Sequence, residues 1–335
     1  MATLDIFNND AFSLSRLTQA IVDIPRVPTQ IGDEGLFSEY GINTLTMMIE
    51  RQGSKLQLVP TAPRGGIPQP VHLTGRKLLP IAAVHLPQTA SVLADEVQGV
   101  RAFGSETEVE AVIKIVTRKL EVMKANLDLT NEYHRIGALK GQVLDADGST
   151  VLWDMYNLFG FTQDTVFFDL STTTTDVKQK CIDLKRKVQV ALGGRALQRV
   201  RVKVSASFFD KLVAHTTVKK AFDLYQQGQH YRTDQSEGDF EYCGVVFQVY
   251  LGGTSAGDFI ATDLGYAYPT GVPNMFQTAY APANYIETVN TNGLPYYVKQ
   301  ERMKFDLGIE MFSQSNPIHL NTLPEAVIKV SAAAS

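Results

Sequence analysis

The 335-residue sequence is poor in cysteine and has no long apolar run. Its two cysteines, Cys181 and Cys243, lie far apart and exclude a disulfide framework, so reduced thiols in a cytosolic setting are expected. The densest apolar stretch, Leu78 to Val84, is seven residues long and contains Pro80. A membrane span needs ~20 such residues. The N-terminus has neither a basic n-region nor an apolar h-region, so no signal peptide and no membrane contact are expected.

Carboxylates are missing from residues 51–94, although the whole chain has a net charge of −4. The five bases of this segment are Arg51, Lys55, Arg64, Arg76 and Lys77. The first fifty residues are acidic instead, with seven carboxylates, Glu34 and Glu39 among them, and two arginines. The basic segment is therefore either a solvated basic face or a projecting element that meets acidic surface elsewhere, including on another copy.

Prolines are also unevenly placed. Eight lie between Pro25 and Pro87, none in residues 88–268, and six from Pro269 to Pro324. Because proline fixes φ and removes a backbone donor, the middle of the chain should hold the regular core. The first quarter should be extended and looped.

The same first quarter has the pattern of a long β-hairpin. Strand-forming runs at 45–49 and 56–59 precede a stretch rich in proline and glycine at 60–70, and further runs follow at 71–74 and 81–86. A long hairpin cannot bury both of its faces within one chain. We therefore expect it to lie on a neighbouring molecule.

The strongest helix signal follows the hairpin. Ser105 can cap a helix whose first turn carries Glu106, Glu108 and Glu110, where the helix dipole favours acids. Apolar residues then recur three and four apart, at Val109, Val112, Ile113, Val116, Leu120, Met123 and Leu127. The pattern predicts a rod of about 30 residues, over 105–137, which Gly137 ends.

The rest of the chain indicates mixed α and β structure. We expect a helix from Thr175–Asp176 to Ala191, a strand at 200–204, a helix capped by Ser205 or Ser207, two strands in 240–251 and a final strand at 326–330. Asp145 and Asp147 suggest a calcium loop at first sight. Their loop lacks the glycine and the terminal glutamate that such a loop requires at fixed positions, and an Asp147-Gly148 hairpin turn fits better.

No motif for chemistry is present. The sequence has no G-x-S-x-G, no P-loop and no G-x-G-x-x-G, and its histidines form no close ligand pair. The missing motifs argue against an enzyme without excluding one, and we predict no cofactor and no metal. The basic segment contains no aromatic residue on which a base could stack, so sequence-specific nucleic-acid recognition is not expected either.

Three stretches resemble a known family. They are Arg135–Ser149, Val202–His215 and a C-terminal block from Asn290 to Val327, in which Gln-Ser-Asn-Pro-Ile followed by Pro-Glu-Ala is the most specific part. The sequence is similar there to the lambda-type major capsid proteins of tailed phages, a family called major capsid protein E. The resemblance covers nearly the whole chain and is weakest in 1–40 and 155–172.

The resemblance implies the α+β fold of a tailed-phage major capsid protein. Its parts would be an N-terminal arm (1–40), an extended β-hairpin loop (41–100), a peripheral domain with the long spine helix (101–172), an axial domain (173–285) and the C-terminal part of the peripheral domain (286–335). It also implies self-assembly into hexamers and pentamers of an icosahedral phage head. The localisation would be the virion capsid, assembled in the host cytoplasm.

The implied partners are other copies of the chain, a separate scaffolding protein and a portal protein; the need for a decoration protein stays open. The loop signals begin near residue 41, which leaves no room for a long N-terminal scaffolding region. The head would enclose double-stranded DNA without sequence-specific binding, and the net charge of −4 suits a wall to which DNA should not adhere.

The bases of the loop should contact carboxylates of an adjacent subunit. The candidates are Glu34 and Glu39 in the arm and Glu106, Glu108 and Glu110 at the start of the spine helix. Two alternatives are weighed against the phage head: the shell of a cellular encapsulating compartment, and a two-domain soluble enzyme without a readable motif.

Overall fold

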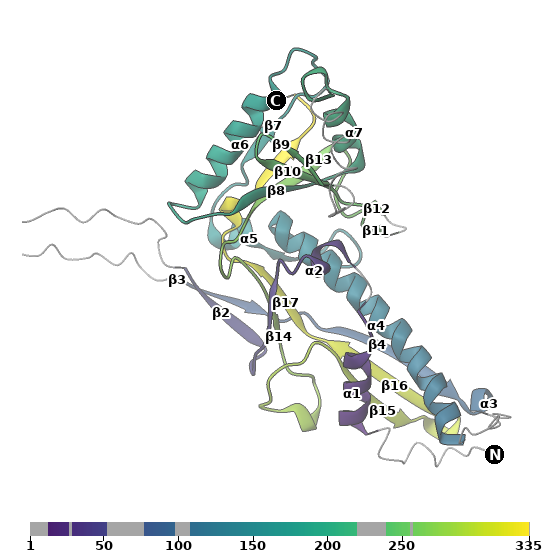
Figure 1. Cartoon of the computed structure of the whole chain (residues 1–335). Coiled ribbons are helices and arrows are strands. Elements are labelled where there is room, and N and C mark those ends of the chain that lie inside the picture. Colours follow the sequence, from purple (N-terminus) through teal and green to yellow (C-terminus); the bar gives the residue numbers. More distant parts are fainter. Residues whose placement is uncertain are drawn as a thin grey trace, which may run out of the picture.

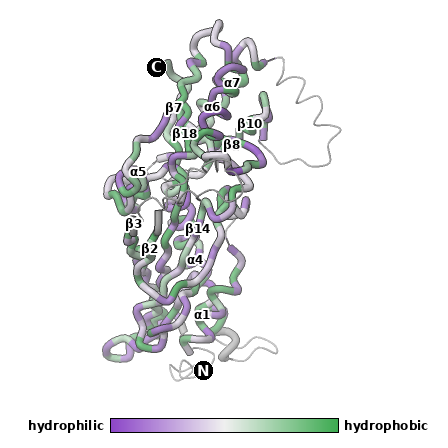
Figure 2. The backbone as a smooth tube through the Cα atoms, turned by 90° about the vertical axis from the view of Figure 1, so that its left-hand side faces the viewer, coloured by the Kyte–Doolittle hydropathy of each residue, from purple (hydrophilic) through white to green (hydrophobic). Residues whose placement is uncertain are grey.

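The computed structural model describes residues 13–26, 29–51, 77–97, 108–219, 239–254 and 257–334. Its helices are α1 (Leu14–Asp23), α2 (Gln30–Asp33), α3 (Ala94–Val97), α4 (Glu108–Lys140), α5 (Met155–Phe159), α6 (Val177–Ala191) and α7 (Ala206–Ala214). Short 3₁₀ turns are η3 (Ile286–Thr288), η4 (Lys304–Asp306) and η5 (Pro324–Ala326). The molecule is long and narrow from both directions of view (Figures 1 and 2).

The strands before α7 are β1 (Ser38–Gly41), β2 (Thr46–Arg51), β3 (Lys77–Ala82), β4 (Leu86–Leu93), β5 (Gln142–Leu144), β6 (Val151–Asp154), β7 (Thr165–Phe167) and β8 (Arg199–Val204). Those after it are β9 (Asp239–Tyr242), β10 (Val245–Val249), β11 (Gly253–Thr254), β12 (Gly257–Asp258), β13 (Leu264–Thr270), β14 (Phe276–Tyr280), β15 (Tyr297–Arg302), β16 (Gly308–Ser315), β17 (Pro317–Asn321) and β18 (Ile328–Ser331).

One half of the molecule is built on a six-stranded sheet of order β7-β18-β13-β8-β10-β9, next to which α6 and α7 lie (Figure 1). In β8, Val200, Val202 and Val204 alternate toward a core that contains Phe208 and Phe247. The predicted strand at 200–204 is confirmed, but it is more buried than an alternating strand with one solvated face, since Lys203 on its other face is also buried. The sheet includes β7 and β18, which lie in sequence on either side of the range 173–285 predicted for the axial domain.

The other half is built on α4 and two three-stranded sheets, of order β15-β16-β4 and β1-β14-β17 (Figure 1). β16 and β17 follow one another through Asn316, so one stretch of chain serves both sheets. The buried Asn316 donates to Pro282 O at 3.1 Å and contacts His85 Nδ1 at 2.8 Å. The Gln-Ser-Asn-Pro-Ile run is therefore the polar bend between two sheets.

The long helix α4 confirms the prediction of a spine, but the predicted end at residue 137 is wrong. The helix passes through Gly137 and ends at Lys140, and Gly141 follows at φ +88°. A Cβ on Gly137 would lie 2.8 Å from the Cα of Val143. Glycine at 137 thus permits the close approach of β5 to the helix, and Gly141 makes the left-handed turn that ends it.

Several local predictions are confirmed. Asp176 caps α6 by accepting from Gln179 N, and Ser205, rather than Ser207, caps α7 by accepting from Phe208 N. β5 and β6 form the predicted hairpin around Gly148. The predicted strand at 81–86 is divided instead between the end of β3 and the start of β4. The last strand begins at Ile328 because η5 occupies Pro324–Ala326.

Candidate functional site

The base of the predicted hairpin loop is an antiparallel pair, β2 with β3, whose register runs from Thr46 opposite Ala82 to Arg51 opposite Lys77. One face of this ribbon packs on the core through Leu79 and Ile81. On the opposite face Met48, which pairs with Pro80, is 63% exposed. The ribbon therefore presents a bare apolar face, as the sequence pattern led us to expect.

Only some of the charged residues predicted to form inter-subunit contacts lie in the described part of the chain. Lys55, Arg64, Arg76 and Glu106 lie outside the described residues. Arg51 and Lys77 form the last described pair of the ribbon, and Glu108 and Glu110 lie in the first turn of α4. For these four residues the structure describes the backbone position alone.

Glu39 has cationic partners in its own subunit. Its carboxylate accepts from Arg135 Nη2 at 2.6 Å and from Arg26 Nη2 at 3.2 Å, and the Tyr280 hydroxyl donates to it at 3.2 Å. The Arg135 side chain is 3% exposed. Glu39 therefore neutralises a buried guanidinium of the spine helix, which is a role that the sequence did not reveal.

Glu34 also has partners within the chain. It forms an ion pair with the fully buried Lys203, lies 3.7 Å from Arg201 Nη1, and accepts from the Tyr268 hydroxyl at 3.2 Å. Burial lowers the pKa of Lys203, and Glu34 counteracts that shift. This contact fastens the N-terminal arm to the six-stranded sheet. An additional contact of Glu34 or Glu39 with another subunit stays a prediction.

Two further charged residues of α4 hold the arm, and our sequence analysis missed them. Lys124 Nζ donates to the carbonyls of Ile21 at 2.9 Å and Val22 at 3.0 Å, at the end of α1. Glu132 accepts from the backbone N–H groups of Ile31 and Gly32. The available signal was the spacing of polar residues, since Lys124, Asp128, Glu132 and Arg135 recur every three or four positions and so share one helix face.

Groups suited to catalysis are scarce in the described part of the chain. No cluster of three metal-ligating side chains occurs among these residues. Burial raises the pKa of the Cys181 thiol, which opposes formation of a reactive thiolate. None of the described helices is long and apolar enough to cross a membrane.

The fold and these surfaces fit an assembly subunit: an elongated molecule with a ribbon that leaves one apolar face exposed and an arm held along the spine helix. The comparisons with known proteins agree. The family model for phage major capsid protein E matches residues 13–332, so the chain belongs to that family. It has a structural role in the phage capsid, and its place is the virion.

Individual relatives and structures are consistent with this assignment. The major capsid protein of Salmonella phage Felix O1 is 26% identical, over 96% of each chain. That of Pseudomonas phage KPP10 is 27% identical, over 96% of this chain and 97% of the relative. The capsid structure of cyanophage P-SCSP1u has a TM-score of 0.51 at 12% identity, with 93% of this chain and 90% of the other covered, and shows the same fold.

Proposed function

We propose that the chain assembles into the hexamers and pentamers of an icosahedral phage head that encloses double-stranded DNA, and that it has no catalytic activity. The observation that carries this proposal is the β2–β3 ribbon, whose Met48 face is bare although its other face is buried. A ribbon with one bare apolar face is stabilised when a second molecule covers it. The net charge of −4 disfavours adhesion of the enclosed DNA to the protein shell.

The register of the ribbon supports a charged contact with a neighbour. Arg51 and Lys77 are directly opposite one another, and like charges at such positions destabilise a strand pair. A carboxylate from another copy would offset that repulsion. Glu106, Glu108 and Glu110 are the stronger candidates, because Glu34 and Glu39 already contact cations in their own subunit.

The parts of the subunit would be those that the sequence predicts, with one addition. We propose an arm (1–40), an extended loop (41–100), a peripheral domain (101–172 and 286–335) and an axial domain (173–285). β7 and β18 would belong to the axial sheet, since β18 pairs with both β13 and β7. A separate scaffolding protein and a portal protein would act with the chain during assembly in the host cytoplasm.

Electron microscopy and light scattering of the purified protein, alone and with its scaffolding protein, test the proposal. We expect closed shells from the wild type and from Arg76→Lys/Lys77→Arg, which keeps both charges. Arg76→Glu/Lys77→Glu should give folded subunits that assemble poorly. A wild-type protein that stays monomeric under every assembly condition would refute the shell. Normal assembly of the glutamate variant at physiological salt would refute the role of the loop bases.

A further inference from the structure

The turn between β15 and β16 exposes an aromatic ring in an unfavourable backbone conformation. Phe305 is 91% exposed and lies at φ 62°, ψ 20°, and Asp306 follows at φ 53°. Left-handed backbone is rare for a bulky residue, and such strain concentrates where function requires it. Exposure of the ring gives the isolated subunit no hydrophobic stabilisation. The turn therefore suggests a contact outside the subunit.

Two leucines extend the apolar surface around this ring. Leu307 is 58% exposed and Leu93 is 41% exposed. They lie at the same end of the sheet, because Leu93 pairs with Gly308 and the N–H of Ala94 donates to Leu307 O at 3.0 Å. We call Leu93, Phe305 and Leu307 the tip knob.

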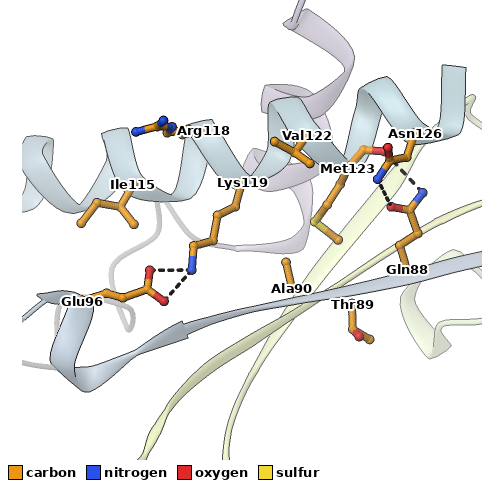
Figure 3. Close-up of a pocket in the computed structure, with 10 residues that line it drawn as sticks. All are labelled: Gln88, Thr89, Ala90, Glu96, Ile115, Arg118, Lys119, Val122, Met123 and Asn126. Carbon is orange, nitrogen blue, oxygen red and sulfur yellow. Dashed lines mark hydrogen bonds and ion pairs between the residues drawn. The ribbon is translucent and has the colours of Figure 1, made fainter. Parts of the chain in front are cut away.

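A groove of about 640 Å³ lies between α4 and β4 (Figure 3). Ile115, Val122 and Met123 line its helix side, and the small side chain of Ala90 lies on its strand side. Two polar pairs cross it: Lys119 with Glu96, between Ile115 and Val122, and Asn126 with Gln88 beyond Met123. The apolar stretch between these pairs can accept a side chain of the size of an aromatic ring.

The helix side of this groove belongs to a face of α4 other than those buried against the sheet β15-β16-β4 and against the arm. We call it the third face of the helix. Ile115, Val122 and Leu129 are seven residues apart and so lie on one line along the helix. Val122 is 60% exposed and Leu129 is 43% exposed, whereas Leu120 and Leu127 are 1% exposed. Val122 and Leu129 are therefore apolar side chains outside the subunit core, whereas Ile115 is partly buried against it.

We propose that Phe305 of one subunit inserts into the α4–β4 groove of a neighbouring copy, between the two polar pairs. This contact rests on the shell proposed above. Charge favours the pairing, because Lys304 and Asp306 flank the ring and Glu96 and Arg118 line the groove. Asp306 would lie near Arg118 of the partner subunit, and Lys304 would lie near Glu96 of the partner subunit.

A second copy is needed because both elements are rigidly held in one sheet. Val92 pairs with Ile309 and Ala90 with Met311, so the β16 turn cannot fold back onto the groove beside its own β4. Each copy then offers a knob and a groove at the same end of the molecule. The tip knob of one copy then meets the groove of the next, so the contact joins two different surfaces. A contact of this kind closes into a ring when the rotation between copies permits it.

Disulfide trapping tests the contact in assembled shells. Phe305→Cys/Val122→Cys should form intermolecular disulfides on mild oxidation, giving a ladder on a non-reducing gel that stops at the size of the closed rings in the shell. Phe305→Cys/Val190→Cys is the matched control, since Val190 is 80% exposed on α6, and should stay monomeric on the gel. Equal cross-linking in both double variants, or dimers from Phe305→Cys alone, would overturn the proposal.

A second variant keeps the test decisive if the cysteine variants do not assemble. Phe305→Asn suits the left-handed backbone, so the unassembled subunit should melt at the wild-type temperature or above. Its shell yield should fall by about tenfold or more, as for loss of an interface anchor. Ala90→Phe, which fills the groove, should have the same effect on yield. Wild-type yields for both would overturn the contact, whereas failure of the wild type itself to form shells would overturn the shell.

Discussion

Two faces of the spine helix are buried by different chemistry. The face toward the sheet β15-β16-β4 presents Val116, Leu120 and Leu127, which pack in one apolar cluster with Val298 and Met311. The face toward the arm presents Lys124, Asp128, Glu132 and Arg135, all at most 3% exposed. Each of these four groups has a partner, among them the ends of α1 and α2, Glu39 and the Tyr296 hydroxyl.

The difference indicates how firmly each neighbour is held. Apolar burial stabilises the contact between helix and sheet by ~1.5–3 kcal/mol for each large side chain, and water cannot replace it. Charged groups, in contrast, are well solvated when a contact opens, so an ionic face costs less to expose. The arm has apolar contacts as well, since Leu17 and Ile21 of α1 lie in the same buried cluster as Leu120. We therefore expect the ionic part of the arm contact, rather than the sheet contact, to open first.

The largest effect should come from the sheet face. Leu120→Ala should lower the free energy of unfolding of the unassembled subunit by about 2–5 kcal/mol, because it leaves a cavity in the apolar cluster. Denaturant unfolding measures this change. Leu129→Ala, on the exposed line of the same helix, is the matched control and should change stability by no more than ~0.5 kcal/mol. Similar losses in both variants would mean that the sheet face is not the main source of stability.

Acid should weaken the contact between α4 and β17, in the sheet β1-β14-β17, through two buried histidines. His134 on α4 and His319 on β17 lie with ring centroids 6.0 Å apart. Burial lowers the pKa of His134 from 6.5 to about 4, and burial together with Arg135 lowers that of His319 well below its ordinary value. The folded state thus disfavours protonation of these rings. The free energy of unfolding should therefore be unaffected by them above pH 6.5 and should fall as the pH drops from 6.5 toward 4.

For His134 alone, the lowered pKa corresponds to a loss of roughly 3 kcal/mol over that interval. Unfolding measured at several pH values should show it, and the difference between wild type and His134→Gln isolates it from the titration of carboxylates. The variant should lose less stability than the wild type between pH 6.5 and 4. Parallel pH profiles would show that His134 is not responsible.

A smaller effect should come from the arm face. Lys124→Met keeps the length of the side chain but removes the donors to the carbonyls of Ile21 and Val22, so stability should fall by ~1–3 kcal/mol. Amide hydrogen exchange should increase mainly in α1. Lys299→Met, which removes an exposed pair with Glu287, should cost less than ~1 kcal/mol and leave exchange in α1 unchanged. A uniform increase across the sheets would contradict a local clamp.

The smallest effect on the subunit should come from the third face of the helix. Val122→Ser alters a side chain that is 60% exposed, so the unfolding free energy should change by no more than ~0.5 kcal/mol. Shell yield should fall nevertheless if the groove receives Phe305. A large loss of subunit stability would show that Val122 belongs to the core after all.

Local signals in the sequence determined the individual elements. Apolar residues three and four apart located α4, and Asp176 located the start of α6. The two strands predicted in 240–251 are β9 and β10, with Gly244 at φ +75° in the turn between them. These signals act within a few residues of the chain, so no tertiary information is needed to recognise them. The motifs at the C-terminus likewise sufficed to suggest the family.

Only the tertiary structure decided which elements meet. Glu34 pairs with Lys203, which is 169 positions away, and Glu39 pairs with Arg135, which is 96 positions away. The sequence around either glutamate does not identify its partner. Gly137 looked like a helix end because the approach of β5 could not be seen in the sequence. β18 could be predicted as a strand, but its place between β13 and β7 depends on long-range register. Such pairings arise from packing of the whole chain, which short-range preferences do not specify.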